Sequence, residues 1–76
     1  MAGIHVMPNP ADERVTIQSD QRMQRVRMFN GYGQMVSNEL IDSDSHVLQV
    51  NELKGGVYYL HILTGDEEVI VQLVIL

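Results

Sequence analysis

The sequence lacks cysteine and tryptophan and has a single phenylalanine among its 76 residues. Without cysteine the chain cannot form a disulfide framework, a thiolate zinc site, an iron–sulfur cluster or a thiol nucleophile. Basic residues are scarce as well: five Lys and Arg stand against ten Asp and Glu, which gives a net charge of −5. This sign argues against sequence-independent nucleic-acid binding and against docking on an anionic membrane, since both need a basic surface.

Long hydrophobic runs are missing too. No stretch approaches the ~20 apolar residues of a membrane span, so no membrane insertion is expected. Residues 1–6 carry neither the basic nor the apolar region of a secretory signal peptide. The chain is therefore either an intracellular protein or one domain of a longer exported protein. We favour a single domain over residues 4–76, with residues 1–3 as an initiating methionine and cloning remainder.

Apolar and polar residues alternate with a period of two, in short runs bounded by Gly, Pro, Asn, Asp or Ser. No window holds a helical stripe for ten residues. These features predict an all-β fold, an immunoglobulin-like antiparallel β-sandwich of about seven short strands. The last two runs are apolar on both faces, which indicates a partner, a sheet extension or a central position. The expected strands are residues 4–7, 13–18, 25–30, 34–40, 46–50, 57–64 and 68–75.

Turn-forming residues separate these runs. Pro8-Asn9-Pro10 ends the first run, because proline cannot donate a ladder hydrogen bond and forces extended neighbours. Asn30-Gly31-Tyr32-Gly33 supplies residues that tolerate positive φ, as a tight hairpin requires. Gly55-Gly56 does the same before the sixth run, and Thr64-Gly65-Asp66 turns between the last two.

Neither metal ligands nor catalytic groups cluster in the sequence. His5, His46 and His61 lie far apart and are interpreted as ordinary surface or half-buried histidines. Gly31-Tyr32-Gly33 is a lone Gly-x-Gly without a following helix, so it is a turn and not a phosphate cradle. The serines stand outside nucleophile motifs, and a chain of this length leaves little volume for a substrate cleft. We expect no cofactor and no enzymatic activity.

Two acidic clusters are interpreted as solvated turns. Asp42-Ser43-Asp44 has a faint likeness to a calcium loop, but the sixth position would be Val47 and the twelfth Leu53, where Gly and Glu are required. Asp66-Glu67-Glu68 is a charged turn at a hairpin end.

The basic residues Arg22, Arg25 and Arg27 form the one basic cluster of the sequence. Two readings stay open for it: a solvated strand face, or a docking patch for an acidic partner.

Several sequence elements, taken in order, resemble a known family. Val26 to Asn30 is a strand ending in Asn-x-x-Gly-Gln, and Leu53 to Leu60 reads Leu-Lys-Gly-Gly-Val-Tyr-Tyr-Leu. They follow Pro8-Asn9-Pro10 and precede a final apolar strand. This order is similar to the C-terminal sorting domain of proteins exported by the type IX (Por) secretion system, type A subfamily.

The resemblance implies an immunoglobulin-like domain that directs a cargo protein from the periplasm across the outer membrane. Its partners would be the outer-membrane translocon and a sortase-like protease that removes the domain, so that the cargo reaches the cell surface or the extracellular space. The family commonly has a lysine where this chain has Gln72. By resemblance, the sorting motif comprises Pro8, Asn9, Pro10, Gly33, Leu53, Gly55, Gly56, Val57, Tyr58, Gln72, Leu73, Val74, Ile75 and Leu76.

The two-faced apolar last strand suggests how such a domain is recognised. We expect a receptor to read the folded domain together with this strand, by pairing with its backbone edge and accepting alternate side chains in pockets. Gly55-Gly56 would set the register of the neighbouring strands. The alternatives are an extracellular immunoglobulin-like binding or structural module that is retained on the mature protein, and a homodimer formed through the apolar strand.

Overall fold

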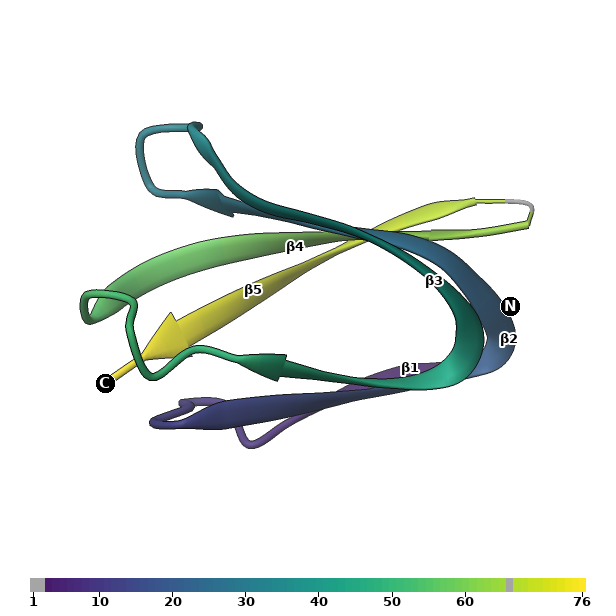
Figure 1. The fold of residues 1–76 in the computed structure, drawn as a ribbon, viewed down its shortest axis with the longest axis horizontal. Coiled ribbons are helices and arrows are strands. Elements are labelled where there is room, and N and C mark those ends of the chain that lie inside the picture. The colour runs from purple at the N-terminus through teal and green to yellow at the C-terminus, as the bar shows by residue number, and fades with distance from the viewer. Residues whose placement is uncertain (1–2, 66) are drawn as a thin grey trace.

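Five antiparallel strands form the fold of the computed structural model, which describes residues 3–65 and 67–76 (Figure 1). Within the described residues there is no helix, and hence none of the length and hydropathy that cross a membrane. The prediction of an all-β fold is confirmed. Residues 1 and 2 of the expected remainder, and Asp66 of the expected acidic turn, lie outside the described residues. The strands are β1 (Ile4–Met7), β2 (Arg14–Asn30), β3 (Met35–Gln49), β4 (Gly56–Thr64) and β5 (Glu68–Ile75).

The number of strands differs from the predicted seven because two pairs of runs are continuous. β2 contains the runs 13–18 and 25–30 almost entirely, and β3 likewise joins 34–40 to 46–50. Neither strand contains a glycine or proline, the residues that most readily end a strand. Both strands therefore continue through a bend at the places where the sequence predicted that one strand ends and the next begins.

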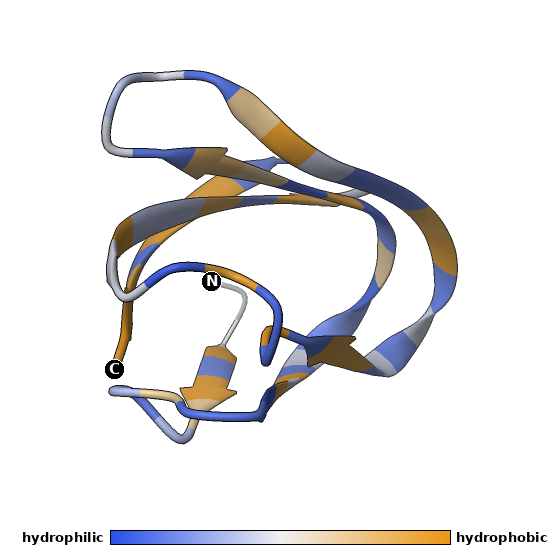
Figure 2. Cartoon of the chain, turned by 60° about the vertical axis from the view of Figure 1, so that its left-hand side comes forward, coloured by the Kyte–Doolittle hydropathy of each residue, from blue (hydrophilic) through white to orange (hydrophobic). Residues whose placement is uncertain are grey.

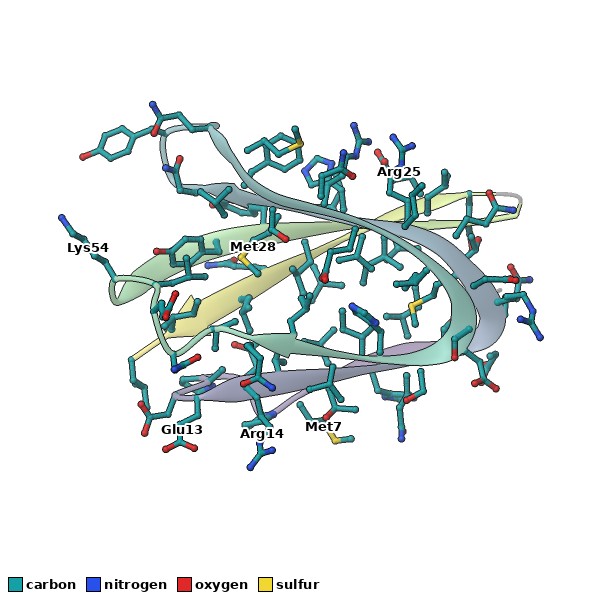
Figure 3. All side chains as sticks on the ribbon, in the orientation of Figure 1. Met7, Glu13, Arg14, Arg25, Met28 and Lys54 are labelled. Atoms are coloured by element: carbon teal, nitrogen blue, oxygen red, sulfur yellow. The ribbon has the colours of Figure 1, made fainter. Side chains whose placement is uncertain are left out.

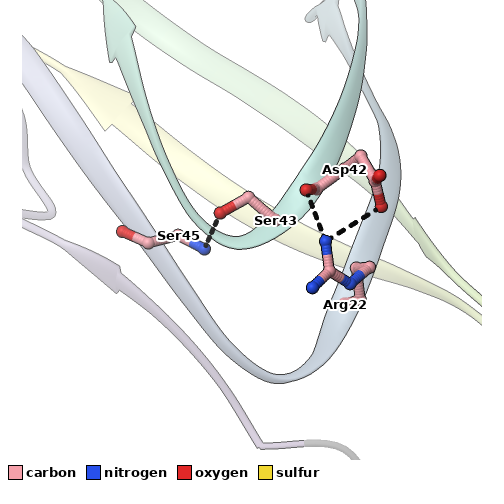
Figure 4. A network of polar contacts seen from close by, with 4 residues as sticks. All are labelled: Arg22, Asp42, Ser43 and Ser45. Carbon is pink, nitrogen blue, oxygen red and sulfur yellow. Dashed lines mark hydrogen bonds and ion pairs between the residues drawn. The ribbon is translucent and has the colours of Figure 1, made fainter.

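Serine side chains mark the bend in both strands. Ser19 Oγ accepts a hydrogen bond from the Gln21 amide at 3.1 Å. Ser43 Oγ likewise accepts one from the Ser45 amide at 3.1 Å (Figure 4). Such local bonds to the backbone compete with the regular ladder. The bend folds the sheet over, so that its two halves face each other (Figure 1).

The strand register shifts at the same place. Gln18 of β2 pairs with Ser45 of β3, but the next partners are Met23 and Ser43. Five steps along β2 thus match two along β3, an irregularity that increases strand curvature. Arg22 lies within this longer segment and donates to the main-chain oxygen and Oδ1 of Asp42, at 2.8 and 3.1 Å (Figure 4).

β2 is the central strand of the sheet. Its first part pairs with β1, from Ile4↔Ser19 to Met7↔Thr16, and its second part pairs with β4. β3 runs beside β2 along both parts. β5 pairs with β4 in unbroken register, from Gly56↔Ile75 to Leu63↔Glu68. The sheet order is therefore β1-β2-β4-β5, with β3 on the opposite side of β2.

Hydrophobic side chains fill the space between the two halves of the sheet. In Figure 3 Met28 points into this space, whereas Arg14, Arg25 and Lys54 point away from it. Figure 2 shows hydrophobic and hydrophilic residues alternating along the strands. The buried hydrophobic cluster consists of Ala11, Val15, Ile17, Met23, Val26, Met28, Leu48, Val50, Tyr58, Leu60, Ile62, Leu73 and Ile75.

Replacing one of these core side chains tests the packing. Leu60 is fully buried, so we expect Leu60→Ala to lower the free energy of unfolding by about 2–5 kcal/mol, through lost burial and the cavity left behind. Leu40, which is 76% exposed, is the matched control. Leu40→Ala should change the free energy of unfolding by less than about 0.5 kcal/mol. Urea unfolding followed by circular dichroism measures both, and equal effects would contradict the core assignment.

Candidate functional site: the edge of the last strand

The segment Pro8-Asn9-Pro10 lies against the outer edge of β5. The Asn9 side chain donates from Nδ2 to the Gln72 carbonyl at 2.9 Å, and its Oδ1 accepts from the Val74 amide at 3.0 Å. One amide side chain thus supplies the donor and acceptor that a neighbouring peptide unit would supply. The two prolines, each preceded by a cis peptide bond, have no amide hydrogen to offer.

Ala11 extends this contact with its main chain. Its amide donates to the Val74 carbonyl at 2.8 Å, and its carbonyl accepts from the Leu76 amide at 2.9 Å. Ala11 and Ile75 form a parallel bridge, and the Ala11 side chain is fully buried. We call residues 8–11 the strap. It joins the first loop of the domain to the last strand, across 65 residues between Asn9 and Val74.

The Gly55-Gly56 turn lies beside the end of the same strand. A Cβ atom on Gly55 would lie 3.1 Å from the Leu76 carbonyl carbon, closer than most contacts of real Cβ atoms. Gly56 has a φ of +153°, which favours glycine. Tyr58, buried next to the turn, donates from its hydroxyl to the Lys54 carbonyl at 2.7 Å. The turn therefore needs both glycines where it meets β5.

The Asn-x-x-Gly-Gln element forms the turn between β2 and β3. Asn30 Oδ1 accepts hydrogen bonds from the amides of Tyr32 and Gln34, at 2.9 and 3.0 Å, and its Nδ2 donates to Gln34 Oε1 at 2.9 Å. Gly33 has a φ of +83° and donates to the Asn30 carbonyl at 3.0 Å. This network explains the residue types of the element by turn geometry alone.

The structure thus gathers most of the expected sorting motif at one place. The strap and the Gly55-Gly56 turn both contact β5 within residues 72–76. Gly33 lies in a different turn, and Leu53 packs against the core. Sequence reasoning missed Ala11 and the partners of Asn9, because no pattern in a sequence identifies which distant backbone an asparagine will bind.

Side chains alternate along β5 between the core and the outer face. Leu73 and Ile75 are buried, whereas Ile70 is 58% and Leu76 73% exposed. Gln72 and Val57 lie on the outer face, opposite Tyr59 and Val74 in the ladder. Gln72 can therefore be replaced without disturbing the core.

The arginines do not form one basic patch. Arg27 donates to Glu68 Oε2 at 2.5 Å, and Arg22 binds Asp42 at the bend. Arg27 also lies 5.9 Å from the ring centroid of Phe29, whose ring is 4.5 Å from that of His61. Two of the three cations are thus paired inside the domain, which favours the interpretation as a strand face.

Glu68 is held ionised by this cluster. The hydrogen bond from Arg27 keeps the pKa of Glu68 below its usual value, and the nearby charges of Arg27 and His61 act in the same direction against partial desolvation. His61 Nδ1 is 3.6 Å from the carboxylate.

The other acidic and histidine residues are dispersed. His46 of β3 contacts Glu39 at 3.1 Å, while His5 lies on β1. Within residues 3–65 and 67–76, no group of three or more His, Asp or Glu side chains could hold a metal ion.

Comparison with known proteins agrees with the motif order. A family model described as secretion system C-terminal sorting domain matches residues 5–76, nearly the whole chain. Among curated proteins, no sequence matches this chain significantly. A sorting-signal family of this kind is not a catalytic family.

Gly56 gives a test of the turn. Gly56→Ala places a side chain where φ is +153°, and we expect it to lower the free energy of unfolding by about 1–3 kcal/mol. Gly31→Ala is the matched control, because a Cβ there meets its nearest atom, the Val57 carbonyl oxygen, at an ordinary 3.7 Å. Urea unfolding of both variants measures the difference; if Gly56→Ala is as stable as Gly31→Ala, the turn does not need glycine at that position.

Glu68 gives a test of the charge cluster. The pKa of Glu68 is lower in the folded protein than in the unfolded chain. Ionised Glu68 therefore stabilises the fold at pH values above its unfolded-state pKa, and this stabilisation is lost as the pH falls through its folded-state pKa. We expect the unfolding free energy of the wild type to fall more steeply in acid than that of Glu68→Gln. Glu67→Gln should keep the wild-type slope, and added salt should reduce the difference. Identical slopes for all three proteins would show that the Arg27–Glu68 ion pair contributes nothing to stability.

Proposed function

The chain belongs to the secretion system C-terminal sorting domain family, and on that premise we propose that β5, whose edge the strap partly covers, is the element by which the type IX secretion machinery recognises its cargo. Membership makes the domain a C-terminal sorting signal for type IX secretion, exported to the cell surface or extracellular space as part of a cargo protein. The observation that carries the proposal is the hydrogen bonding of Asn9 to Gln72 and Val74, which joins two distant motif elements into one surface.

We further propose that the folded sheet acts as an immunoglobulin-like sandwich of the type A subfamily. The bend in β2 and β3 supports this proposal, because each of these strands contributes to both facing halves. Counting each bent strand twice gives the seven strand segments that such a sandwich contains. The domain over residues 4–76 would then behave as one rigid recognition unit.

Recognition would use the parts of β5 that the domain leaves accessible. Ile70 and Gln72 point outward, and β5 offers main-chain groups along its outer edge. Strand pairing at such an edge gives affinity through the backbone and specificity through alternate side chains. The translocon would bind here before a sortase-like protease separates the domain from its cargo.

An export assay tests this proposal. A reporter with its own signal peptide, fused in front of the domain, is produced in a host that carries the secretion system. We expect removal of residues 73–76 to abolish export. Because Leu73 and Ile75 are core residues, a folded variant is needed as well: Ile70→Ser should reduce export at wild-type stability, whereas Leu40→Ser, the matched exposed control on β3, should not. Unchanged export of the truncated protein would overturn the role of the last strand.

A further inference from the structure

The three sheet edges of the described chain are protected to very different degrees. β1 is four residues long and runs directly into Pro8, and β3 is bent and carries Glu39, Asp42 and Asp44. Short length, proline, bends and charges are the usual means of preventing edge pairing. β5 has none of them from Val69 onward: it is uncharged, contains no proline and pairs with β4 without a register shift.

The strap covers only the second half of the β5 edge. Its hydrogen bonds reach Gln72, Val74 and Leu76, alternate residues whose backbone groups face the same side. By the same alternation, the backbone groups of Glu68 and Ile70 face this side, and the strap makes no hydrogen bond to either of these two described residues. An unguarded stretch of edge therefore precedes a covered one.

The strap is also a weak substitute for a strand. Two of its four hydrogen bonds to β5 come from the exposed Asn9 side chain, and its two prolines can never donate one. A continuous extended segment would instead pair with every outward group from Glu68 to Leu76. Such a segment offers more bonds at the same edge than the strap does.

We propose that the strap is displaceable, and that an extended segment of the secretion machinery enters at Ile70, pairs with β5 as far as Leu76 and expels the strap. This rests on the proposed function and names the form of the partner. The partner segment would be a β-strand with alternating apolar side chains and with basic or neutral residues at its entry end, because Glu67 and Glu68 flank that end.

Displacement of the strap would affect β1, at the start of the domain. The strap leads directly from β1, and among the described residues β1 pairs only with β2, over four residues. Cargo precedes a C-terminal sorting domain, so the cargo chain enters through β1. Pairing at the last strand would therefore loosen the segment that connects the domain to its cargo, although the two lie at opposite ends of the sequence.

A peptide-binding experiment on the 76-residue protein tests strap exchange. The probe is a synthetic peptide with the sequence of residues 57–64, flanked by lysines, since this sequence already pairs with β5 on its other side. We expect Asn9→Ala to bind it about tenfold more tightly than the wild type, because two competing hydrogen bonds are lost. Asn51→Ala, an exposed turn asparagine, is the control and should bind as the wild type does.

Hydrogen exchange locates the binding. On adding the peptide to the wild type, the Ile70 amide should gain protection and the amides of β1 should lose it. Equal affinity of wild type and Asn9→Ala, no binding to either, or unchanged protection of β1 would each overturn the proposal.

A disulfide lock tests it in cells. Ala11→Cys combined with Ile75→Cys links bridge partners in a chain with no other cysteine. We expect oxidation of the double variant to block export of the reporter, compared with the same double variant kept reduced. If the wild-type reporter is not exported, the proposed function fails. If the locked and wild-type reporters are exported equally, only strap exchange fails. Should the reduced double variant misfold, the Asn9→Ala comparison decides.

Discussion

The hydrogen bonds between the strap and β5 are the contact on which the arrangement of this domain depends. β2 and β3 fold the sheet over, but a folded sheet has one closed side, at the bend, and one open side. Asn9 and Ala11 close the open side by joining the loop after β1 to the edge of β5. The core residues Ile75 and Ala11 meet there, so closure of the edge and burial of the core are one event.

This closure takes the place of the cross-links that other small domains use. A domain of 76 residues buries a limited share of its surface, and many of similar size add disulfides or a metal. Here a long-range contact between residues 9 and 74 connects the two ends of the chain without covalent chemistry. Unlike a disulfide, such a contact is reversible, and its hydrogen bonds are each worth only ~0.5–1.5 kcal/mol. Reversibility is what a domain needs if its edge must be covered at one time and read at another.

The sequence was informative wherever the chain obeys a local rule. The period-two alternation predicted an all-β fold, and Gly33 and Gly56 lie in turns as the sequence indicated. It was misleading at the bends, because Ser19 and Ser43 redirect the chain by side-chain hydrogen bonds while it stays extended. It was silent on the partner of Asn9, since that depends on which strand edge the completed fold brings near.

The residues of the last strand have two different roles. Leu73 and Ile75 are buried and Gly55 makes room for Leu76, so these residues are explained by folding alone. A receptor that meets the folded domain cannot contact a buried side chain. Under the proposed function, the receptor would therefore read the outward residues of β5 and the backbone of its edge. Gln72 holds one of these outward positions, and its carbonyl accepts a hydrogen bond from Asn9. Under the proposed recognition, one residue would thus present an outward side chain to the receptor while the strap covers its backbone.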